Sequence, residues 1–491
     1  METKKNYVAF DCGNSSIRVM AGLYDGRKIE LRRVHQLPNE AIHVNGIFYW
    51  DILYIFRELQ LGLKKAYLEY GPVESAGIST WGIDFGLIGK SGQLLGNPLC
   101  YRNAFGETAL QEISEANKYK TFMATGIMDH PMNSLYQLIG IKKCLPEYYK
   151  EAQWLLLMPD LLAWLFTGSI CGESSIASTT QILDMRNETY ASQVIDLYHL
   201  NGSLFPAFIR HGESCGHLKQ DIARALKINS FPFVSIASHD TASAVVSVPT
   251  QAKNFLFISS GTWSLIGTQL EDPIINRDVY TQGFSNEGGA LGTITFLKNS
   301  TGMHILQNIK KEMEQGGRNY DWEEIVSLAN ACKTRVPVFN PNDTLFFNPQ
   351  DMSTAICKYT KKDLAIEEVL ASAYLSLACS YRDGIEKIEK LTQKTYPVIH
   401  IVGGGCKNNH LNQLTADITG KTVIAGPEDA TSLGNIGLQL KRNKPDIDLL
   451  QIKKILMASI SVQSFIPNAD SDIISEINAY YQEYKNLDKS G

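Results

Sequence analysis

Two short loops that follow apolar strands are rich in glycine and hydroxyl residues. The first, residues 11–18, follows the predicted strand 7–10, and the second, residues 259–264, follows the predicted strand 255–258. Small residues leave backbone N–H groups open to an anion, and hydroxyl groups supply further donors. Either loop alone is more typical of an ordinary hairpin, but two of them facing each other across a cleft would hold a polyphosphate from both sides. The pair therefore favours a nucleotide-using enzyme.

Two further features agree with nucleotide binding. Asp11 lies where the first strand leaves its sheet, a usual position for a carboxylate that binds Mg²⁺, because this ion takes one or two carboxylates together with phosphate and water. Three glycines, 403–405, separate a predicted strand at 398–402 from a helix-like segment at 409–418, where bare backbone can accept adenine or phosphate. A plain helix end or strand end is the alternative for these glycines. The chain has neither a complete dinucleotide fingerprint nor a Walker loop.

Asp240 is the best candidate for a general base. It follows a predicted strand at 231–237 and precedes the small-residue run 242–246. Phosphoryl transfer needs positioning, charge neutralisation and a carboxylate that takes the proton from the attacking hydroxyl. The local sequence by itself favours a helix N-cap instead, because Asp and Ser commonly begin such helices. The neighbouring His239, taken singly, is more typical of a hydrogen-bonded partner than of a catalyst.

The elements that must position these residues can be predicted from spacing. Residues 19–24 and 28–34, joined by a turn at Asp25, indicate a hairpin. Asp51 can cap a helix with apolar residues at helical spacing: Ile52, Ile55, Phe56, Leu59 and Leu63. A second long helical pattern runs from about residue 363 to 391.

The length of the chain and a change in its polarity near residues 249–254 indicate two domains. A chain of 491 residues is too long for one ordinary core. The sequence turns polar near residues 249–254, just before the second glycine–hydroxyl loop. We therefore expect an N-terminal domain over 1–247 and a C-terminal domain over 248–491, each with its own copy of the loop.

The composition excludes several classes of protein. The net charge of −5, from 46 basic and 51 acidic side chains, gives no basic surface for nucleic acid. The nine cysteines are scattered and never form a C-x-x-C pair, which predicts reduced thiols rather than a disulfide framework or zinc site. No secretory signal is evident, and the most apolar stretch, residues 154–166, is too short to span a membrane. We expect a cytoplasmic protein without membrane partners; the sequence leaves monomer and dimer open.

Several separated segments resemble the FGGY family of carbohydrate kinases, in the actin-like ATPase superfamily. The likeness extends over essentially the whole chain, and the segments that carry it are residues 80–85, 157–160, 237–245, 259–265, 286–289, 297–299 and 401–406. It implies an α/β fold with two ribonuclease-H-like domains and the active site in the cleft between them.

The resemblance also implies an activity and a set of site residues. The expected reaction is the ATP-dependent phosphorylation of L-rhamnulose at its C1 hydroxyl, in L-rhamnose catabolism, with ATP and Mg²⁺ as cofactors. By similarity, Asp240 becomes the catalytic base rather than a cap, and Asp11 helps to place Mg²⁺. Contacts with the ketose are implied for Gly82, His239, Asp240, Thr241 and Asn299. Contacts with ATP are implied for Asn14, Ser15, Ser16, Ile17, Arg18, Thr262, Gln307 and Gly404.

Some positions depart from the pattern of the family. Ile17 stands in the first loop where relatives often carry Gly, and Asp429 stands where many carry Glu. Neither change removes a proposed catalytic group. The cysteine pairs of some relatives are absent. The alternatives left open are a kinase for another ketose, such as L-fuculose or L-xylulose, and a non-catalytic sugar or nucleotide sensor on the same fold.

Overall fold

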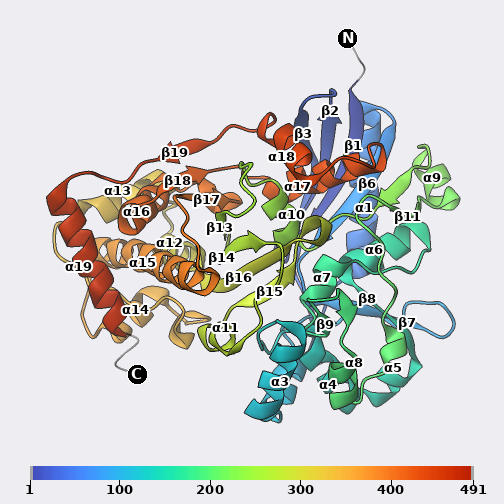
Figure 1. The fold of residues 1–491 in the computed structure, drawn as a ribbon, viewed down its shortest axis with the longest axis horizontal. Helices are drawn as coiled ribbons and strands as arrows, with labels where there is room; N and C mark the ends of the chain where they lie inside the picture. Colours follow the sequence, from blue (N-terminus) through green and yellow to red (C-terminus); the bar gives the residue numbers. More distant parts are fainter. Residues whose placement is uncertain (1–3, 488–491) are drawn as a thin grey trace. The chain divides into compact units, whose positions relative to one another are not determined.

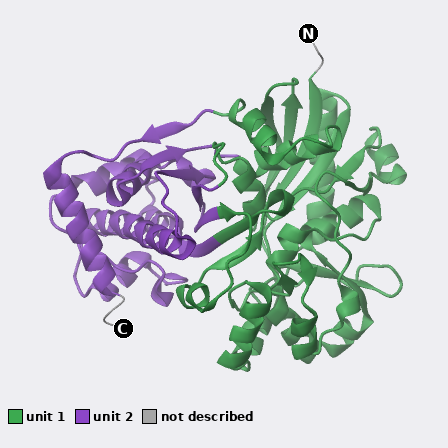
Figure 2. Ribbon diagram, viewed as in Figure 1, with its two compact units in different colours: residues 1–253, 269–296, 430–460 green, residues 254–268, 297–429, 461–491 purple. Residues whose placement is uncertain are grey.

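The computed structural model describes residues 4–487, which form two compact units (Figures 1 and 2). Unit 1 comprises residues 1–253, 269–296 and 430–460, and unit 2 comprises residues 254–268, 297–429 and 461–491. Each unit therefore collects segments that are far apart in the sequence. The division of the chain at residues 247 and 248 into two domains stays a prediction.

The main sheet of unit 1 has six strands in the order β11-β12-β6-β1-β2-β3. β1 pairs with β2 in the antiparallel and with β6 in the parallel direction. The predicted hairpin is confirmed, and Asp25 Oδ1 accepts backbone hydrogen bonds from residues 27 and 28 at 2.9 Å in its turn. The strands span Lys5–Cys12 (β1), Ser16–Tyr24 (β2), Ile29–Pro38 (β3), Val73–Thr80 (β6), Ser214–His217 (β11) and Pro232–Val234 (β12).

Alternate residues of β1 enter two different cores, because successive side chains of a strand point to opposite faces. Val8 and Phe10 pack in one core with residues of α1 (Ile52–Tyr70) and α6 (Met158–Thr167). Tyr7 and Ala9 pack in the other core with residues of α17 (Ala430–Gln439) and α18 (Leu449–Met457). The central strand is thus covered on both faces, which fixes the position of Asp11 at its end.

The helix predicted from Asp51 is confirmed as α1. The Asp51 carboxylate accepts a hydrogen bond from the backbone N–H of Tyr54 at 3.0 Å, and the helix ends at Tyr70, followed by the capping residue Gly71, whose φ is +83°. Of the five apolar positions at helical spacing, Ile52, Ile55, Leu59 and Leu63 are buried, and Phe56 is partly buried against the same core.

Unit 1 contains further elements outside this six-stranded sheet, and one of them, β15, belongs to the seven-stranded sheet of β13 (Leu256–Ser260) and β14 (Trp263–Leu270). These further elements are β4 (Ile42–Val44), β5 (Ile47–Tyr49), β7 (Phe85–Gly89), α2 (Phe105–Gln111), α3 (Glu115–Thr125), α4 (Ser134–Cys144), α5 (Pro146–Glu151), β8 (Ala152–Leu157), α7 (Ser174–Ser178), β9 (Leu183–Asp184), β10 (Thr189–Tyr190), α8 (Ser192–Leu197), α9 (Gln220–Leu226), α10 (Asp240–Val246), α11 (Arg277–Gln282) and β15 (Ser285–Gly288).

Unit 2 repeats the strand arrangement of the first loop. β13 (Leu256–Ser260) pairs with β14 (Trp263–Leu270) in the antiparallel and with β17 (Val398–Val402) in the parallel direction, as β1 does with β2 and β6. β18 (Thr422–Ala425) and β19 (Gln463–Phe465) follow β17 in the sheet. The two glycine–hydroxyl loops are therefore equivalent hairpin turns, as the sequence suggests.

Helices cover the sheet of unit 2. The predicted long helix is confirmed as α15 (Ile366–Thr392), which buries Leu370, Ala373, Leu377, Ile385 and Ile388. The other elements are β16 (Ile294–Thr301), α12 (His304–Glu314), α13 (Trp322–Ala331), α14 (Met352–Thr360), α16 (Asn409–Thr419) and α19 (Ser471–Leu487). Within residues 4–487, no helix combines the length and the apolar character needed to cross a membrane.

Candidate active site

Asp240 is the first residue of α10 and lies beside the end of β6. The strand predicted at 231–237 is shorter than expected: β12 spans Pro232–Val234, and Ser235 is hydrogen-bonded to backbone groups of residues 212 and 213. Thr80 next donates its backbone N–H to the Ser238 carbonyl at 2.9 Å. This contact extends the parallel alignment as far as His239, so that two neighbouring chain ends of one sheet meet at the site.

The Asp240 carboxylate has two donors and an open side. Its Oδ1 accepts the backbone N–H of Thr241 at 2.6 Å and the Thr241 hydroxyl at 3.2 Å, while about a third of the side chain, 34%, is exposed. Crowding by protein atoms raises the pKa of Asp240, and the facing His239 and the Thr241 donors oppose that rise. The carboxylate is therefore recessed but reachable, as a general base must be.

His239 lies between two carboxylates. Its Nε2 is 3.3 Å from Asp240 Oδ1, and its Nδ1 is 3.2 Å from Oε2 of Glu287 on β15. The contact with Glu287 is an ion pair rather than a well-aligned hydrogen bond. Burial disfavours the charged imidazole, but the charges of Glu287 and Asp240 outweigh burial and raise the pKa of His239 to about 9. These two carboxylates thus favour a protonated imidazole directly beside Asp240.

Glu173 anchors the chain just before His239. Its carboxylate accepts hydrogen bonds from the backbone N–H of Ser238 at 3.1 Å and from the Ser238 hydroxyl. It also accepts the N–H and hydroxyl of Ser175, at 2.7 and 2.6 Å, and pairs with His211 at 2.6 Å. Burial works against the ionised form, yet His211 and these donors prevail and lower the pKa of Glu173 to about 2. A buried carboxylate so well bonded holds its loop firmly.

Gly82 lies in the turn that follows β6. A Cβ atom there would come within about 3 Å of the Thr179 side chain, at 2.9 Å, so the turn has room for glycine alone without a shift. Asp84 fixes the turn by accepting hydrogen bonds from the indole N–H of Trp50 at 2.6 Å and from that of Trp81 at 2.9 Å. Burial raises the pKa of Asp84 to about 7. Trp81 is therefore a supporting core residue.

The first glycine–hydroxyl loop is closed by its own backbone. Gly13 donates its N–H to the Ser16 carbonyl at 2.9 Å, and Asn14 donates to the Tyr101 hydroxyl at 3.2 Å. Ser15 is exposed. The Ile17 side chain is fully buried in the core beside β1, so only its backbone can face a ligand.

Asp11, at the end of β1, is 3% exposed and is held by two donors. Its Oδ2 accepts Arg18 Nη2 at 2.7 Å and the Ser432 hydroxyl at 2.9 Å. In the described part of the chain, no cluster of three or more His, Cys, Asp or Glu side chains forms a metal cage. A single strand-end carboxylate still fits Mg²⁺, which is usually bound through one or two carboxylates and substrate phosphates.

The second loop brings three of the predicted nucleotide residues into one part of unit 2. The Thr262 carbonyl accepts the backbone N–H of His304 at 3.0 Å, where α12 begins, and Gln307 lies in the first turn of that helix. Gly405 packs so closely on Ser260 that a Cβ atom would lie 2.0 Å from its hydroxyl. The adjacent Gly404 is exposed, with nothing near the place of a Cβ atom. The triple glycine therefore lies against the second loop.

Asn299 lies on β16 in unit 2 and is exposed, whereas the other four predicted sugar contacts belong to unit 1. Of those four, His239 and Thr241 are buried, Gly82 is half-buried and Asp240 has the open side described above. The roles assigned to all these residues stay predictions.

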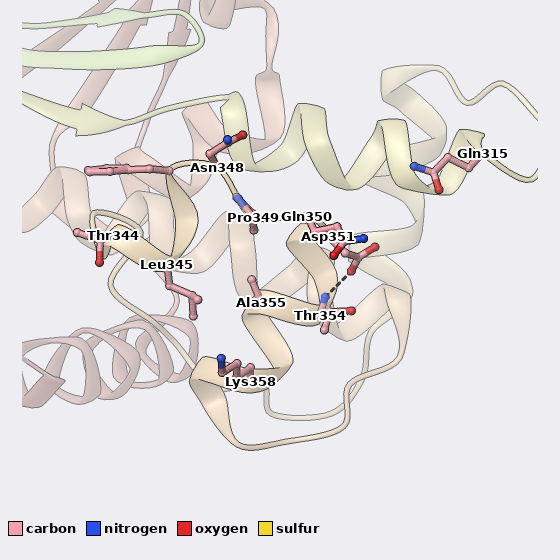
Figure 3. A pocket seen from close by; sticks show the side chains of 11 residues that line it. Gln315, Thr344, Leu345, Asn348, Pro349, Gln350, Asp351, Thr354, Ala355 and Lys358 are labelled. Carbon is pink, nitrogen blue, oxygen red and sulfur yellow. Dashed lines mark hydrogen bonds between the residues drawn. The ribbon is translucent and has the colours of Figure 1, made fainter. Parts of the chain in front are cut away.

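An open pocket of about 960 Å³ lies in unit 2 but contains none of the predicted site residues (Figure 3). At its rim, Asp351 accepts the backbone N–H of Thr354 at 2.7 Å and thereby caps α14 (Figure 3). Its Phe347 contacts Trp263 edge-on, with ring centroids 5.7 Å apart.

Four residues of the site are not predicted from the local sequence: Glu173, Glu287, Thr431 and Ser432. Glu287 stands in one of the family-like segments, but nothing in that segment indicates its contact with His239. Thr431 donates its hydroxyl to the Asp240 carbonyl at 3.2 Å, and its neighbour Ser432 donates to Asp11.

The chain is similar to known proteins along nearly its whole length. Residues 6–247 match the N-terminal domain of the FGGY family of carbohydrate kinases, and residues 256–442 match its C-terminal domain. A rhamnulokinase from Bacteroides thetaiotaomicron is 32% identical over 489 residues, which cover 98% of this chain and 99% of that protein.

Solved structures show the same fold at low identity. A ligand-bound xylulose kinase from Lactobacillus acidophilus superimposes with a TM-score of 0.81 at 16% identity, covering 99% of this chain and 97% of that one. A Plasmodium falciparum glycerol kinase with ADP gives a TM-score of 0.79 at 16% identity, covering 99% and 98%. With its mixed α/β two-domain fold, the chain belongs to the FGGY family of carbohydrate kinases and is a sugar kinase that uses ATP.

Proposed function

We propose that the chain transfers the γ-phosphoryl group of ATP to the C1 hydroxyl of L-rhamnulose, giving L-rhamnulose 1-phosphate and ADP. The observation that carries this choice of ketose is the likeness to a rhamnulokinase along 98% of the chain. The proposal includes a cytoplasmic location, as the sequence predicts.

In this proposal Asp240 is the general base. Its partly exposed carboxylate takes the proton of the C1 hydroxyl while the sugar oxygen bonds to phosphorus and the bond from phosphorus to the departing ADP oxygen breaks. The Thr241 N–H and hydroxyl hold Oδ1 of the carboxylate in place. Gly82, His239, Thr241 and Asn299 are the proposed sugar contacts.

The nucleotide is assigned to the two glycine–hydroxyl loops. Asn14, Ser15, Ser16, the Ile17 backbone and Arg18 form one set of contacts, and Thr262, Gln307 and Gly404 form the other. Asp11 is the residue that would hold Mg²⁺, an ion that neutralises charge on the transferred phosphoryl group. Arg18 and Ser432 fix Asp11 for this role through the contacts at 2.7 and 2.9 Å.

The test is ADP release, measured by a coupled assay with Mg-ATP and a panel of L-rhamnulose, L-fuculose, L-xylulose, L-ribulose and glycerol. We expect the highest kcat/KM for L-rhamnulose. A preference for another polyol would overturn the substrate and leave the sugar-kinase assignment in place. Absence of turnover on the whole panel, with a ketose still raising the melting temperature, would support a sensor.

A further inference from the structure

The imidazole of His239 is flanked by a carboxylate at each ring nitrogen. Glu287 Oε2 lies 3.2 Å from Nδ1, and Asp240 Oδ1 lies 3.3 Å from Nε2. The His239 and Glu287 side chains are only 10% and 14% exposed, so water screens their interaction weakly. A neutral imidazole would leave both carboxylates without a counter-charge at this position, whereas the imidazolium places one positive charge between them.

We propose that Glu287 is a positioning residue for phosphoryl transfer, which holds His239 in the charged form beside Asp240 and so keeps the Asp240 carboxylate ionised. The inference rests on the proposed function, because it concerns the base that accepts the sugar proton. Glu287 itself touches no reacting atom. During transfer, one proton passes from the C1 hydroxyl to Asp240, and the protons on His239 stay where they are.

The other charged groups around His239 do not replace Glu287. Glu173, at the start of α7, also acts on His239 through its charge, but Glu173 is paired with His211 at 2.6 Å. Ser175 meets His239 only by accepting its backbone N–H, at 3.2 Å. Glu287 is the one carboxylate besides Asp240 that the described part of the chain places in direct contact with the ring.

Removal of the Glu287 charge shifts the pKa values of His239 and Asp240 in definite directions. In Glu287→Gln, His239 loses the anion that most favours its charged form, so its pKa falls. Asp240 then loses a cation at 3.3 Å and also loses the more distant repulsion of Glu287. The nearer charge has the larger effect, so the pKa of Asp240 rises. An opposite charge at this distance shifts a carboxyl pKa by about one unit or more.

The experiment is the pH profile of kcat/KM for L-rhamnulose in the wild type, Glu287→Gln and Glu287→Asp. We expect the acid limb of Glu287→Gln to move upward by about one pH unit, and that of Glu287→Asp to stay close to the wild type. Glu271→Gln, on an exposed side chain of the same unit, is the matched control. An unshifted limb in an active Glu287→Gln enzyme would overturn the proposal.

A double-mutant comparison tests whether Glu287 acts through His239. In a His239→Gln background no cation separates Glu287 from Asp240, so Glu287→Gln then removes only an anion. The acid limb should stay in place or move downward there, opposite to its movement in the wild-type background. An upward movement in both backgrounds would refute an action through the imidazole.

NMR of the His239 imidazole tests the proposal without relying on turnover, which a misfolded variant would also lose. The imidazole resonances of His239, followed by NMR, should show the charged ring at neutral pH in the wild type and the neutral ring in Glu287→Gln. A neutral ring in the wild type would overturn the inference. If L-rhamnulose is the wrong substrate, the wild type itself is silent with that ketose, whereas a wrong role for Glu287 leaves the wild type active and the variant limb unshifted.

Discussion

Ser432, in the first turn of α17, donates its hydroxyl to Asp11 at the end of β1, although 421 positions separate the two residues in the chain. Both residues are buried, and both belong to unit 1. The preceding residue, Thr431, donates to the Asp240 carbonyl at 3.2 Å. One helix turn therefore contacts the Asp11 carboxylate and the backbone carbonyl of Asp240, the two residues to which the proposed mechanism assigns a role.

This relationship predicts a selective defect in Ser432→Ala. Asp11 keeps its ion pair with Arg18 but loses a buried donor, so we expect the KM for Mg-ATP to rise several-fold and the KM for the ketose to stay nearly constant. A hydrogen bond to a charged group contributes about 1.5–3 kcal/mol to stability, and a loss of that order should appear in urea unfolding. Ser372→Ala removes a buried hydroxyl bonded to the Pro337 carbonyl in unit 2. It controls for the stability that is lost when any buried, hydrogen-bonded hydroxyl is removed. Unchanged Mg-ATP kinetics would contradict a role in holding Asp11.

Asp240→Asn tests the assignment of the base. The amide keeps the shape and an acceptor for the Thr241 donors but takes no proton, so we expect kcat to fall by about 10²–10⁴-fold. Binding of the ketose, measured by its effect on the melting temperature, should remain nearly intact. Asp196→Asn, on the exposed face of α8, is the control and should retain kcat. Turnover by Asp240→Asn at the wild-type rate would exclude Asp240 as the base.

Much of the fold can be predicted from local sequence patterns. The contacts that hold the site residues in place cannot be predicted in this way. Spacing and capping identify α1 from Asp51 and α15 from its apolar side, because those signals lie within the element itself. The contacts of Glu173 with Ser238, and of Glu287 with His239, join side chains whose elements are distant in the sequence. No periodicity records such a contact, since it arises only when the sheet brings the chain ends together. Composition alone likewise extends a strand to residue 237, whereas β12 ends at Val234.

Glu173→Gln should weaken the fold and change its response to acid. The pKa of Glu173 is lowered to about 2 in the folded state, below its ordinary value of 4.5. The wild type therefore has stability that is present above about pH 4.5 and is lost as the pH falls toward 2. The shift corresponds to roughly 3 kcal/mol.

Unfolding of both proteins by urea at several pH values checks this expectation. Glu173→Gln leaves His211 without its carboxylate, so the free energy of unfolding should drop by about 3–5 kcal/mol at neutral pH. The difference between the two proteins should narrow in acid. A difference that is constant with pH would show that the ionised carboxylate does not stabilise the fold. Glu213→Gln, on an exposed residue of the same unit, is the matched control.

Thr262→Val tests the second loop. The Thr262 backbone is fixed by the hydrogen bond from His304, so the variant should fold normally and lose only the hydroxyl. We expect a rise of about tenfold in the KM for ATP, which corresponds to the loss of one hydrogen bond to a charged group, with a smaller effect on the KM for the ketose. Initial-rate kinetics with each substrate varied in turn separate the two effects. Nucleotide kinetics identical to those of the wild type would contradict the assignment of this loop to ATP.

The burial of Lys453 predicts that the folded protein becomes more stable as the solution becomes alkaline. Its Nζ lies 3.1 Å from the Val245 carbonyl and 3.4 Å from the Val248 carbonyl, at the C-terminal end of the helix that begins with Asp240. The side chain is 1% exposed, and burial lowers its pKa to about 7. The unfolded chain binds more protons at this residue between about pH 7 and its ordinary pKa of 10.5, so stability rises with pH in that range.

Lys453→Met should remove this dependence while filling the same space. Between about pH 7 and about pH 9, the wild type should gain about 2 kcal/mol in free energy of unfolding relative to the variant. Lys454→Met, which changes the exposed neighbour on α18, should show the wild-type dependence and so corrects for all other titrating groups. Parallel urea curves for the wild type and Lys453→Met at both pH values would mean that Lys453 stays charged in the folded state, because only a change in protonation between the two states can produce the difference.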